Sequence, residues 1–322
     1  MNVKHLKIFY LFLSIIFFSG CAERELFDNV VSPGITGLFK EIKGNISGKL
    51  SIEDSPFRAV EDVIIDSGKT LIIDPGVEIY FDENSRLIVK GELKISGSYR
   101  WRVFLSAYNT HWKGLKIYYA DKPAEIKFAI IKDIKDNDNS IYGPSSISII
   151  SSSLTLSNSI VLNNSALHGG GIGSDNSVVK IYNNIFRDNF ADNFGGAIIS
   201  ETSDITIINN TLYKNSAFNG GGGIAIYDPV KTEIQNNILY KNYSSRGQIN
   251  FQYASADSAT LIEQYNYFAF GNMDPLFLND DDLRLYFQSP AKDAGNPASE
   301  FNDLDGTRND QGAYGGPLGD WY

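Results

Sequence analysis

The chain has 322 residues, of which 43% are hydrophobic and 20% are charged, and its formal net charge is −10. A chain of this length and composition can bury a sizeable core, which excludes an intrinsically disordered protein. The negative charge disfavours nucleic acid as a partner and, more weakly, polyuronates such as pectin unless calcium intervenes.

Residues 1–20 are predicted to be a signal peptide. Two lysines precede an apolar run at 8–18 that is too short to span a bilayer comfortably, and small residues then lead to Cys21, the single cysteine. This pattern resembles a bacterial lipoprotein signal, although Phe18 stands where that family prefers Leu. The resemblance implies that Cys21 receives lipid and becomes the new N-terminus. An ordinary secretory signal or an uncleaved anchor are the alternatives.

Export to the cell envelope follows from the lipoprotein resemblance, with membrane attachment through the N-terminal lipid. The residues after Cys21 lack the Asp that marks inner-membrane retention in enteric bacteria, which favours the outer membrane or the cell surface. Without the lysines of the signal, the chain has 26 basic and 38 acidic residues, a net charge of −12. Residues 21–43 are predicted to be the lipidated cysteine and a linker.

Short strand-like runs separated by turns begin near residue 44. The segment 63–96 alternates such runs with Gly-containing turns, including Asp74-Pro75-Gly76, which suits a type II turn. Runs at 112–119, 125–134 and 145–162 continue the pattern. No unit has ten residues of helical periodicity, so the helical solenoids are excluded.

An Asn-rich repeat of 25 to 27 residues follows. The chain has 29 Asn, and 15 of them lie between 157 and 242. Asn164, Asn189, Asn215 and Asn242 recur at spacings of 25, 26 and 27. A period of this length fits one coil of a parallel β-helix and is too short for a propeller blade.

The repeat predicts ladders of equivalent residues along the stack of coils, which lie about 4.8 Å apart. The four Asn residues would stack at one turn, and the Gly clusters that follow them would supply positive φ or close strand approach. Ile172, Ile198, Ile224 and Ile249 would stack in the interior. We therefore predict an all-β, right-handed parallel β-helix over residues 44–265, with on the order of eight coils.

Residues 60–265 resemble bacterial right-handed parallel β-helix proteins of the pectate-lyase-like superfamily. The phrases "FRDN" and "GGAI" at 186–198 are similar to repeat motifs of chlamydial polymorphic membrane proteins, which are adhesins. The segment 274–317 resembles the C-terminal end of choice-of-anchor-type secreted proteins. These resemblances imply the fold and leave lyase, hydrolase, adhesin and structural roles open.

Residues 266–322 are predicted to be a loop-rich segment that caps the open end of the stack. Asp303, Asp305 and Asp310 could supply oxygen ligands to calcium, but the positions where an EF-hand requires its first and last carboxylates hold Phe301 and Gly312. The prediction favoured here is a cap without calcium.

Strand alternation predicts an outward column of Arg187, Tyr213 and Tyr240, if the residue before each of them points inward. Stacked aromatic and Arg side chains can bind sugar rings or a partner protein. The alternative is that the column only stabilises the sheet.

No convincing catalytic set is visible. His168-Gly169 lacks the Asp pair and the Arg-x-Lys that glycosidases of this fold carry, so His168 reads as a turn residue. The prediction is a non-catalytic module that binds polysaccharide or a surface protein, as an adhesin does. A polysaccharide lyase or glycoside hydrolase is the alternative, and a purely structural envelope protein is the third. Acidic and basic residues clustered in one cleft would favour an enzyme.

Overall fold

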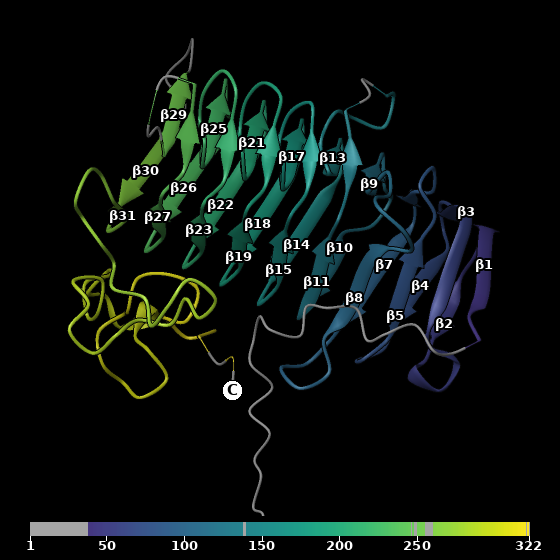
Figure 1. Cartoon of the computed structure of the whole chain (residues 1–322), viewed down its shortest axis with the longest axis horizontal. Helices are drawn as coiled ribbons and strands as arrows, with labels where there is room; N and C mark the ends of the chain where they lie inside the picture. Colours follow the sequence, from purple (N-terminus) through teal and green to yellow (C-terminus); the bar gives the residue numbers. More distant parts are fainter. Residues whose placement is uncertain are drawn as a thin grey trace, which may run out of the picture. The chain divides into compact units, whose positions relative to one another are not determined.

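Three long ladders of parallel strands and a short fourth build the fold, and successive coils of the chain stack along them (Figure 1). The computed structural model describes residues 38–137, 140–245, 247, 250–254, 260–319 and 321. Cys21 and the predicted signal peptide lie outside the described residues. Strands begin at Lys40 and end at Phe268, a few residues beyond both predicted bounds of the β-helix.

The strands of each ladder pair in register from coil to coil. The first ladder contains β1 (Lys40–Asn45), β3 (Phe57–Ile65), β6 (Leu87–Val89), β9 (Leu115–Tyr118), β13 (Ile147–Ile150), β17 (Ile172–Asp175), β21 (Ile198–Glu201), β25 (Ile224–Tyr227) and β29 (Phe251–Ala254). The second ladder contains β5 (Glu78–Phe81), β8 (Val103–Ala107), β11 (Ala129–Lys132), β15 (Ile160–Leu162), β19 (Ile185–Arg187), β23 (Thr211–Tyr213), β27 (Ile238–Tyr240) and β31 (Tyr267–Phe268). Because β3 pairs with both β5 and β6, these two ladders form one sheet.

The third ladder is a separate nine-stranded sheet. It contains β2 (Gly48–Leu50), β4 (Thr70–Ile73), β7 (Glu92–Ser96), β10 (Ala124–Lys127), β14 (Ser153–Ser157), β18 (Val178–Tyr182), β22 (Asp204–Ile208), β26 (Lys231–Gln235) and β30 (Thr260–Gln264). A short fourth ladder contains β12 (Lys135–Asp136), β16 (Ser165–Ala166), β20 (Phe190–Ala191), β24 (Ser216–Ala217) and β28 (Tyr243–Ser244). Two 3-10 turns, η1 (Ile52–Asp54) and η2 (Ser299–Phe301), complete the described elements.

The interior is filled by aliphatic stacks, because alternate residues of each strand point inward. Ile172, Ile198 and Ile224 pair in register and are buried, as predicted. Ile249 lies outside the described residues, and Phe251 pairs with Ile224 at the next position of the stack. The prediction of an all-β parallel solenoid is confirmed.

Between residues 151 and 242 each coil turns three tight corners. A residue with positive φ at each corner is followed by a buried residue, which is polar everywhere except at Pro229. The predicted ladder of Asn164, Asn189, Asn215 and Asn242 is confirmed, with each side-chain oxygen accepting the backbone N–H of the preceding rung. The amide groups also bond from rung to rung at 2.9 to 3.0 Å. These bonds satisfy backbone groups that would otherwise be buried without partners.

Two further ladders occupy the other corners. A second Asn ladder consists of Asn184, Asn210, Asn237 and Asn266. At the third corner, the hydroxyls of Ser177 and Ser203 accept backbone N–H groups from the rungs before them. All three corners thus use short polar side chains to replace strand hydrogen bonds at the bend.

Glycines act at the remaining, wider turn. Gly195 has φ +71°, and a Cβ on the next residue, Gly196, would lie 2.1 Å from the carbonyl oxygen of Gly222. The predicted roles of positive φ and close strand approach are therefore both confirmed, on adjacent residues.

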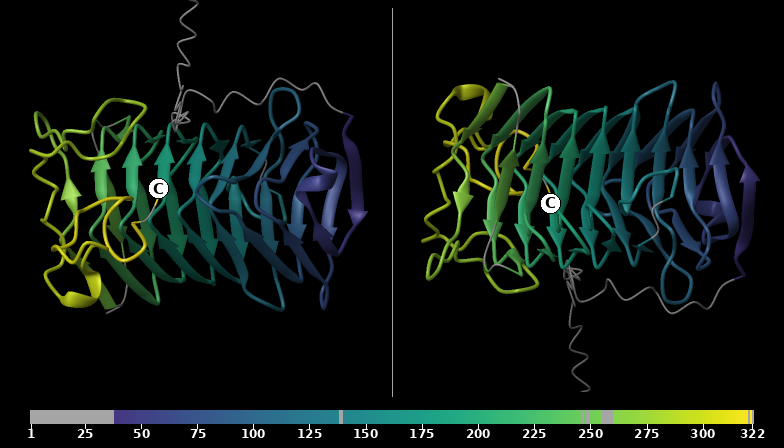
Figure 2. Two further views of the ribbon diagram at one scale, coloured as in Figure 1. Left: turned by 90° about the horizontal axis from the view of Figure 1, so that it is seen from below. Right: turned by 90° about the horizontal axis from the view of Figure 1, so that it is seen from above.

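The C-terminal segment contacts the flank of the coils (Figures 1 and 2). The sequence, by contrast, predicts that this segment covers the open end of the stack. The segment's attachment points are the positive-φ Asn residues of the second corner. Asn183 donates to the carbonyls of Ala313 and Gly315, and Asn158 donates to that of Leu318. The segment buries these corner amides against the flank, and the capping role of residues 266–322 stays a prediction.

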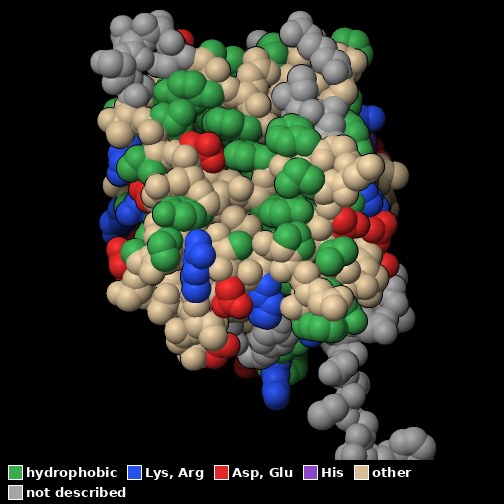
Figure 3. Space-filling model, turned by 90° about the vertical axis from the view of Figure 1, so that its left-hand side faces the viewer, with side chains coloured by type: hydrophobic (Ala, Val, Ile, Leu, Met, Phe, Trp, Pro, Cys, Tyr) green, Lys and Arg blue, Asp and Glu red, His purple; other side chains and the backbone are tan. Residues whose placement is uncertain are grey.

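The C-terminal end of the stack carries exposed apolar side chains on its last coil and the chain that follows (Figure 3). β30 is exposed along its whole length, and Phe251, Tyr253 and Phe268 are only partly buried against the core. Glu263 pairs with the buried Ile234 and so takes an interior-facing position in the last coil. A charge at that position disfavours the addition of further strands.

Candidate functional site

A groove of about 170 Å³ lies over the outer face of β13, β17 and β21. Ser148, Gly173 and Ile199 occupy successive rungs of one outward column. Gly173 has no side chain, which leaves room for Ser145 from the loop that folds over the ladder. The groove is smaller than sites that enclose a drug-sized ligand, so it suits a single ring or one unit of a longer ligand.

A buried ion pair fixes the loop that forms one wall of the groove. Lys116 takes the rung before Ser148, and its Nζ lies 2.7 Å from Asp136 with both side chains fully buried. Lys116 also donates to the carbonyl of Ser145. Burial lowers the pKa of Lys116 to about 8, while the Asp136 carboxylate opposes that shift. The ammonium therefore ties a groove residue to the sheet.

A second outward column contributes the carboxylates of the groove. Asp175, Glu201 and Tyr227 occupy successive rungs, with both carboxylates lining the groove. The hydroxyl of Thr202 donates to Asp175 at 2.6 Å. Burial raises the pKa of Glu201, and the negative charges of Asp175 and Asp228 raise it further. Neither groove carboxylate has an ion-pair partner among the described residues.

Aromatic rings flank the carboxylates. His168 lines the groove and stacks on Phe194 with ring centroids 6.0 Å apart, and Phe194 meets Tyr227 edge to face. Burial lowers the pKa of His168, so the imidazole is neutral at pH 7. The groove therefore combines carboxylate acceptors with the His168 ring, and the rings of Phe194 and Tyr227 extend from it, an arrangement typical of a small-ligand site.

The predicted outward column of Arg187, Tyr213 and Tyr240 forms in register. Its tyrosines point away from the core but are not open to solvent, because Tyr213 is only 1% exposed and Tyr240 only 9%. A hairpin of residues 276–286, which we call the acidic hairpin, covers both rings with Phe277. Ligand binding by these residues stays a prediction.

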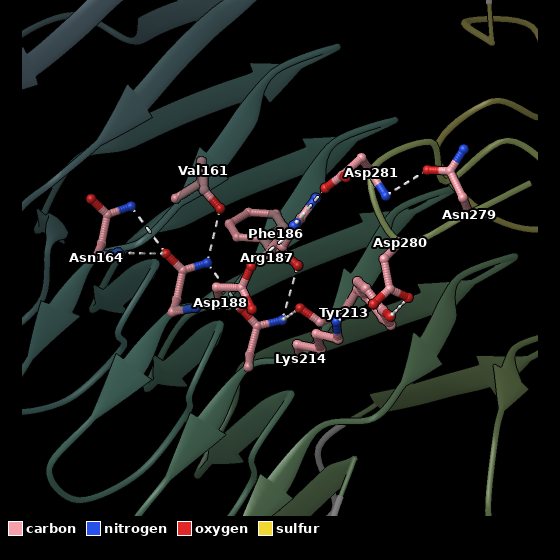
Figure 4. A network of polar contacts seen from close by, with 12 residues as sticks. Val161, Asn164, Phe186, Arg187, Asp188, Tyr213, Lys214, Asn279, Asp280 and Asp281 are labelled. Atoms are coloured by element: carbon pink, nitrogen blue, oxygen red, sulfur yellow. Dashed lines mark hydrogen bonds and ion pairs between the residues drawn. The ribbon is translucent and has the colours of Figure 1, made fainter. Parts of the chain in front are cut away.

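Polar contacts fix the acidic hairpin on the column (Figure 4). Asp280 accepts from the hydroxyl of Tyr213 and pairs with Lys214 at 2.6 Å. Asp281 pairs with Arg187 at 3.1 Å. Burial and the neighbouring Asp280 raise the pKa of the Tyr213 hydroxyl, so this group remains a donor.

Comparison with protein families adds one match. Residues 103–263 match the family described as right handed beta helix region, which is half of the chain. The protein belongs to the right-handed β-helix family. Comparisons with curated proteins and with solved structures returned no match.

The three Asp residues predicted as possible calcium ligands stabilise turns within the C-terminal segment of the β-helix protein. Asp305 accepts from the backbone and hydroxyl of Thr307, and Asp310 pairs with Lys292 at 2.8 Å. Asp303 accepts backbone N–H groups of Asp310 and Gly316. Within the described ranges no group of three His, Cys, Asp or Glu could hold a metal ion. Calcium binding stays the alternative to the predicted cap without calcium.

Asp303 is expected to make the stability of the β-helix protein depend on pH. Burial raises the pKa of Asp303 from 3.8 to about 6, so its contribution to stability is present below about pH 4 and lost as pH rises through about 6. The melting temperature of Asp303→Asn relative to the parent should therefore rise between about pH 4 and pH 7. Asp305→Asn is the control, because hydrogen bonds from Thr307 lower the pKa of Asp305 out of that range. A pH-independent difference for Asp303→Asn would contradict the assignment.

The sequence predicts His168 to be a turn residue and assigns no site role to Asp175, Glu201 or Tyr227. The sequence does contain a signal for these three residues. Each one ends a strand-like run that starts with a small residue and Ile, namely Gly171-Ile172, Ala197-Ile198 or Gly223-Ile224. None of the helices among the described residues is long and apolar enough to cross a membrane.

Proposed function

We propose that this β-helix protein is an exported, lipid-anchored module of the cell envelope that binds a neutral glycan without turning it over. The supporting observation is the groove, which Asp175, Glu201 and His168 line, with Tyr227 on the rung after Glu201. Carboxylates without cationic partners accept hydrogen bonds from sugar hydroxyls, and ring faces pack against the C–H faces of a pyranose. The net charge of −10 disfavours an acidic glycan.

Anchoring through lipid on Cys21 is part of this proposal and rests on the signal-like N-terminus. It would hold the β-helix at a membrane surface, with the outer membrane or cell surface favoured. A glycan of the envelope or of a contacted surface is then the nearest abundant ligand, and an adhesin is the concrete form of the role.

Glycoside hydrolysis is the second candidate, and the carboxylate pair in the groove favours it. Asp175 and Glu201 lie on adjacent coils in register. The raised pKa of Glu201 suits a general acid, and the hydrogen bond from Thr202 suits an ionised Asp175 acting as base or nucleophile. A lyase is disfavoured, because no Lys or Arg lines the groove among the described residues.

A glycan-array screen of residues 22–322 tests the proposal, with neutral and acidic polysaccharides assayed in parallel for new reducing ends. We expect binding of a neutral glycan without turnover, and at least a tenfold loss in Glu201→Gln and in Tyr227→Ala, because each removes a group that faces the sugar. Glu125→Gln is the matched control, since Glu125 is exposed on β10 of the third ladder.

Each outcome of this screen separates the candidates. Turnover that Glu201→Gln abolishes would replace the binding proposal with hydrolysis. Binding that survives both groove substitutions would place the site elsewhere. If no glycan binds and none is cleaved, both candidates fail and a structural role is left.

A further inference from the structure

The flank of the second ladder carries a basic and aromatic surface, which we call the flank column: Arg187, Tyr213, Lys214, Tyr240 and Lys241. It spans three successive coils, because Arg187, Tyr213 and Tyr240 pair in register. Lys214 and Lys241 follow the tyrosines at corners with φ +56° and +54°. Within the coils, Asp188 pairs with Arg187 at 2.7 Å, so the cations of the flank column are only partly neutralised by their own ladder.

The acidic hairpin occupies the flank column as a bound peptide would. Phe277 meets Tyr213 and Tyr240 with ring centroids 5.8 and 6.1 Å apart. Asp280 and Asp281, adjacent in sequence, contact cations on adjacent coils. The contacts of the hairpin therefore show which groups fit the flank column: an aromatic ring followed by two consecutive carboxylates.

Hydrogen bonds within the acidic hairpin fix the backbone that carries Asp280 and Asp281. The side-chain oxygen of Asn279 accepts the backbone N–H groups of Asp281 and Asp282 at 2.8 and 2.9 Å. Arg284 pairs with Asp282, so this third carboxylate is satisfied within the hairpin. Lys214 and the Tyr213 hydroxyl lower the pKa of Asp280 to about 2, and its charge persists at neutral pH.

The ionic part of the hold on the hairpin is weak, and its apolar anchors are Phe277 and the buried Leu283. The Asp280 and Asp281 side chains are 62% and 58% exposed, and ion pairs of such exposure contribute little. Leu276, Leu278 and Tyr286 of the hairpin are also exposed. Lys241 lies over the rings of Tyr240 and Tyr213 and has no ion-pair partner among the described residues, so the occupant leaves part of the column unused.

We infer that the flank column is a binding site for an acidic peptide segment of a partner protein, in which an aromatic residue precedes two consecutive acidic residues. The acidic hairpin is the internal occupant that such a segment displaces. A flexibly tethered occupant competes at an effective concentration on the order of millimolar, so the partner segment must gain from extra contacts, such as a third acid on Lys241. This site is independent of the groove and of the glycan proposal.

The test adds a synthetic peptide of residues 274–288 to the full chain and to the variant Phe277→Ala/Asp280→Asn/Asp281→Asn, with binding followed by calorimetry. We expect the peptide to bind the triple variant at least tenfold more tightly than the parent. Phe287→Ala/Asp282→Asn is the control, since Phe287 is exposed and Asp282 pairs within the hairpin. Lys214→Gln added to the triple variant should abolish binding.

Iodination of Tyr213 and Tyr240, read by mass spectrometry, reports whether the hairpin leaves the column. We expect at least a tenfold faster reaction of Tyr213 in the triple variant. If Tyr213 becomes reactive and the peptide still fails to bind, the inference is overturned. It is also overturned if Tyr213 stays unreactive, because the hairpin is then not a displaceable occupant. Binding of an oligouronate but not of the peptide would assign the column to sugar acids and overturn the peptide class.

Discussion

Gly196→Ala is expected to destabilise the coil stack by more than about 4 kcal/mol. A Cβ at this position would lie 2.1 Å from the carbonyl oxygen of Gly222 and 2.6 Å from that of Ser216. Both obstacles are backbone atoms of the next coil, so no change of rotamer can relieve them. Equilibrium unfolding in denaturant, followed by far-UV circular dichroism, measures the loss, and failure to recover folded protein is the extreme form of the same result.

Gly68→Ala separates this packing effect from the general cost of replacing a glycine. Gly68 has φ +74° and open space around its Cβ position, so Ala there adds backbone strain of about 1–2 kcal/mol and no clash. If both substitutions reduced the unfolding free energy equally, close approach of the coils would not be the reason that position 196 requires glycine.

Asn210→Ala is expected to cost about 3–5 kcal/mol of unfolding free energy, because it leaves several buried groups unpaired at once. The Asn210 oxygen accepts both the backbone and the side-chain amide of Asn184. Its amide nitrogen donates to two backbone carbonyls and to Asn237. The same denaturant titration measures the effect, with an unchanged m-value indicating that the fold is kept.

Asn219→Ala is the matched control for the ladder. Asn219 also bonds to an Asn one coil away, Asn193, at 3.0 Å, but both side chains are only partly buried. Water can replace that bond, so we expect a loss of less than about 1 kcal/mol. If Asn219→Ala were as costly as Asn210→Ala, rung-to-rung bonding rather than burial would explain the ladder.

The fold could be predicted because it repeats. A period near 26 residues fixes which residues are equivalent, and strand alternation then assigns Ile172, Ile198 and Ile224 to the interior. The second Asn ladder could also have been predicted, from the Asn-Asn pairs at 183–184, 209–210 and 236–237. The first Asn of each pair takes positive φ and the second forms the ladder.

The sites could not be predicted, because they depend on segments that do not repeat. Periodicity places Tyr213 and Tyr240 on the outside of a coil, and it carries no information on Phe277 covering them from 37 residues beyond Tyr240. Likewise, the groove needs the Ser145 loop folded over Gly173. That contact is held by the pair of Lys116 and Asp136, which belong to different elements.

Docking of the C-terminal segment on Asn236, Asn209, Asn183 and Asn158 has a mechanical consequence. A solenoid pulled from one end would ordinarily peel apart one coil at a time, since each coil contacts only its neighbours. Here one stretch of chain is bonded to four successive corners, and Trp321 at its end lies over Arg102. Tension on that stretch would load these bonds in shear, many at once, so the last coils should detach together and at a higher force than any single coil.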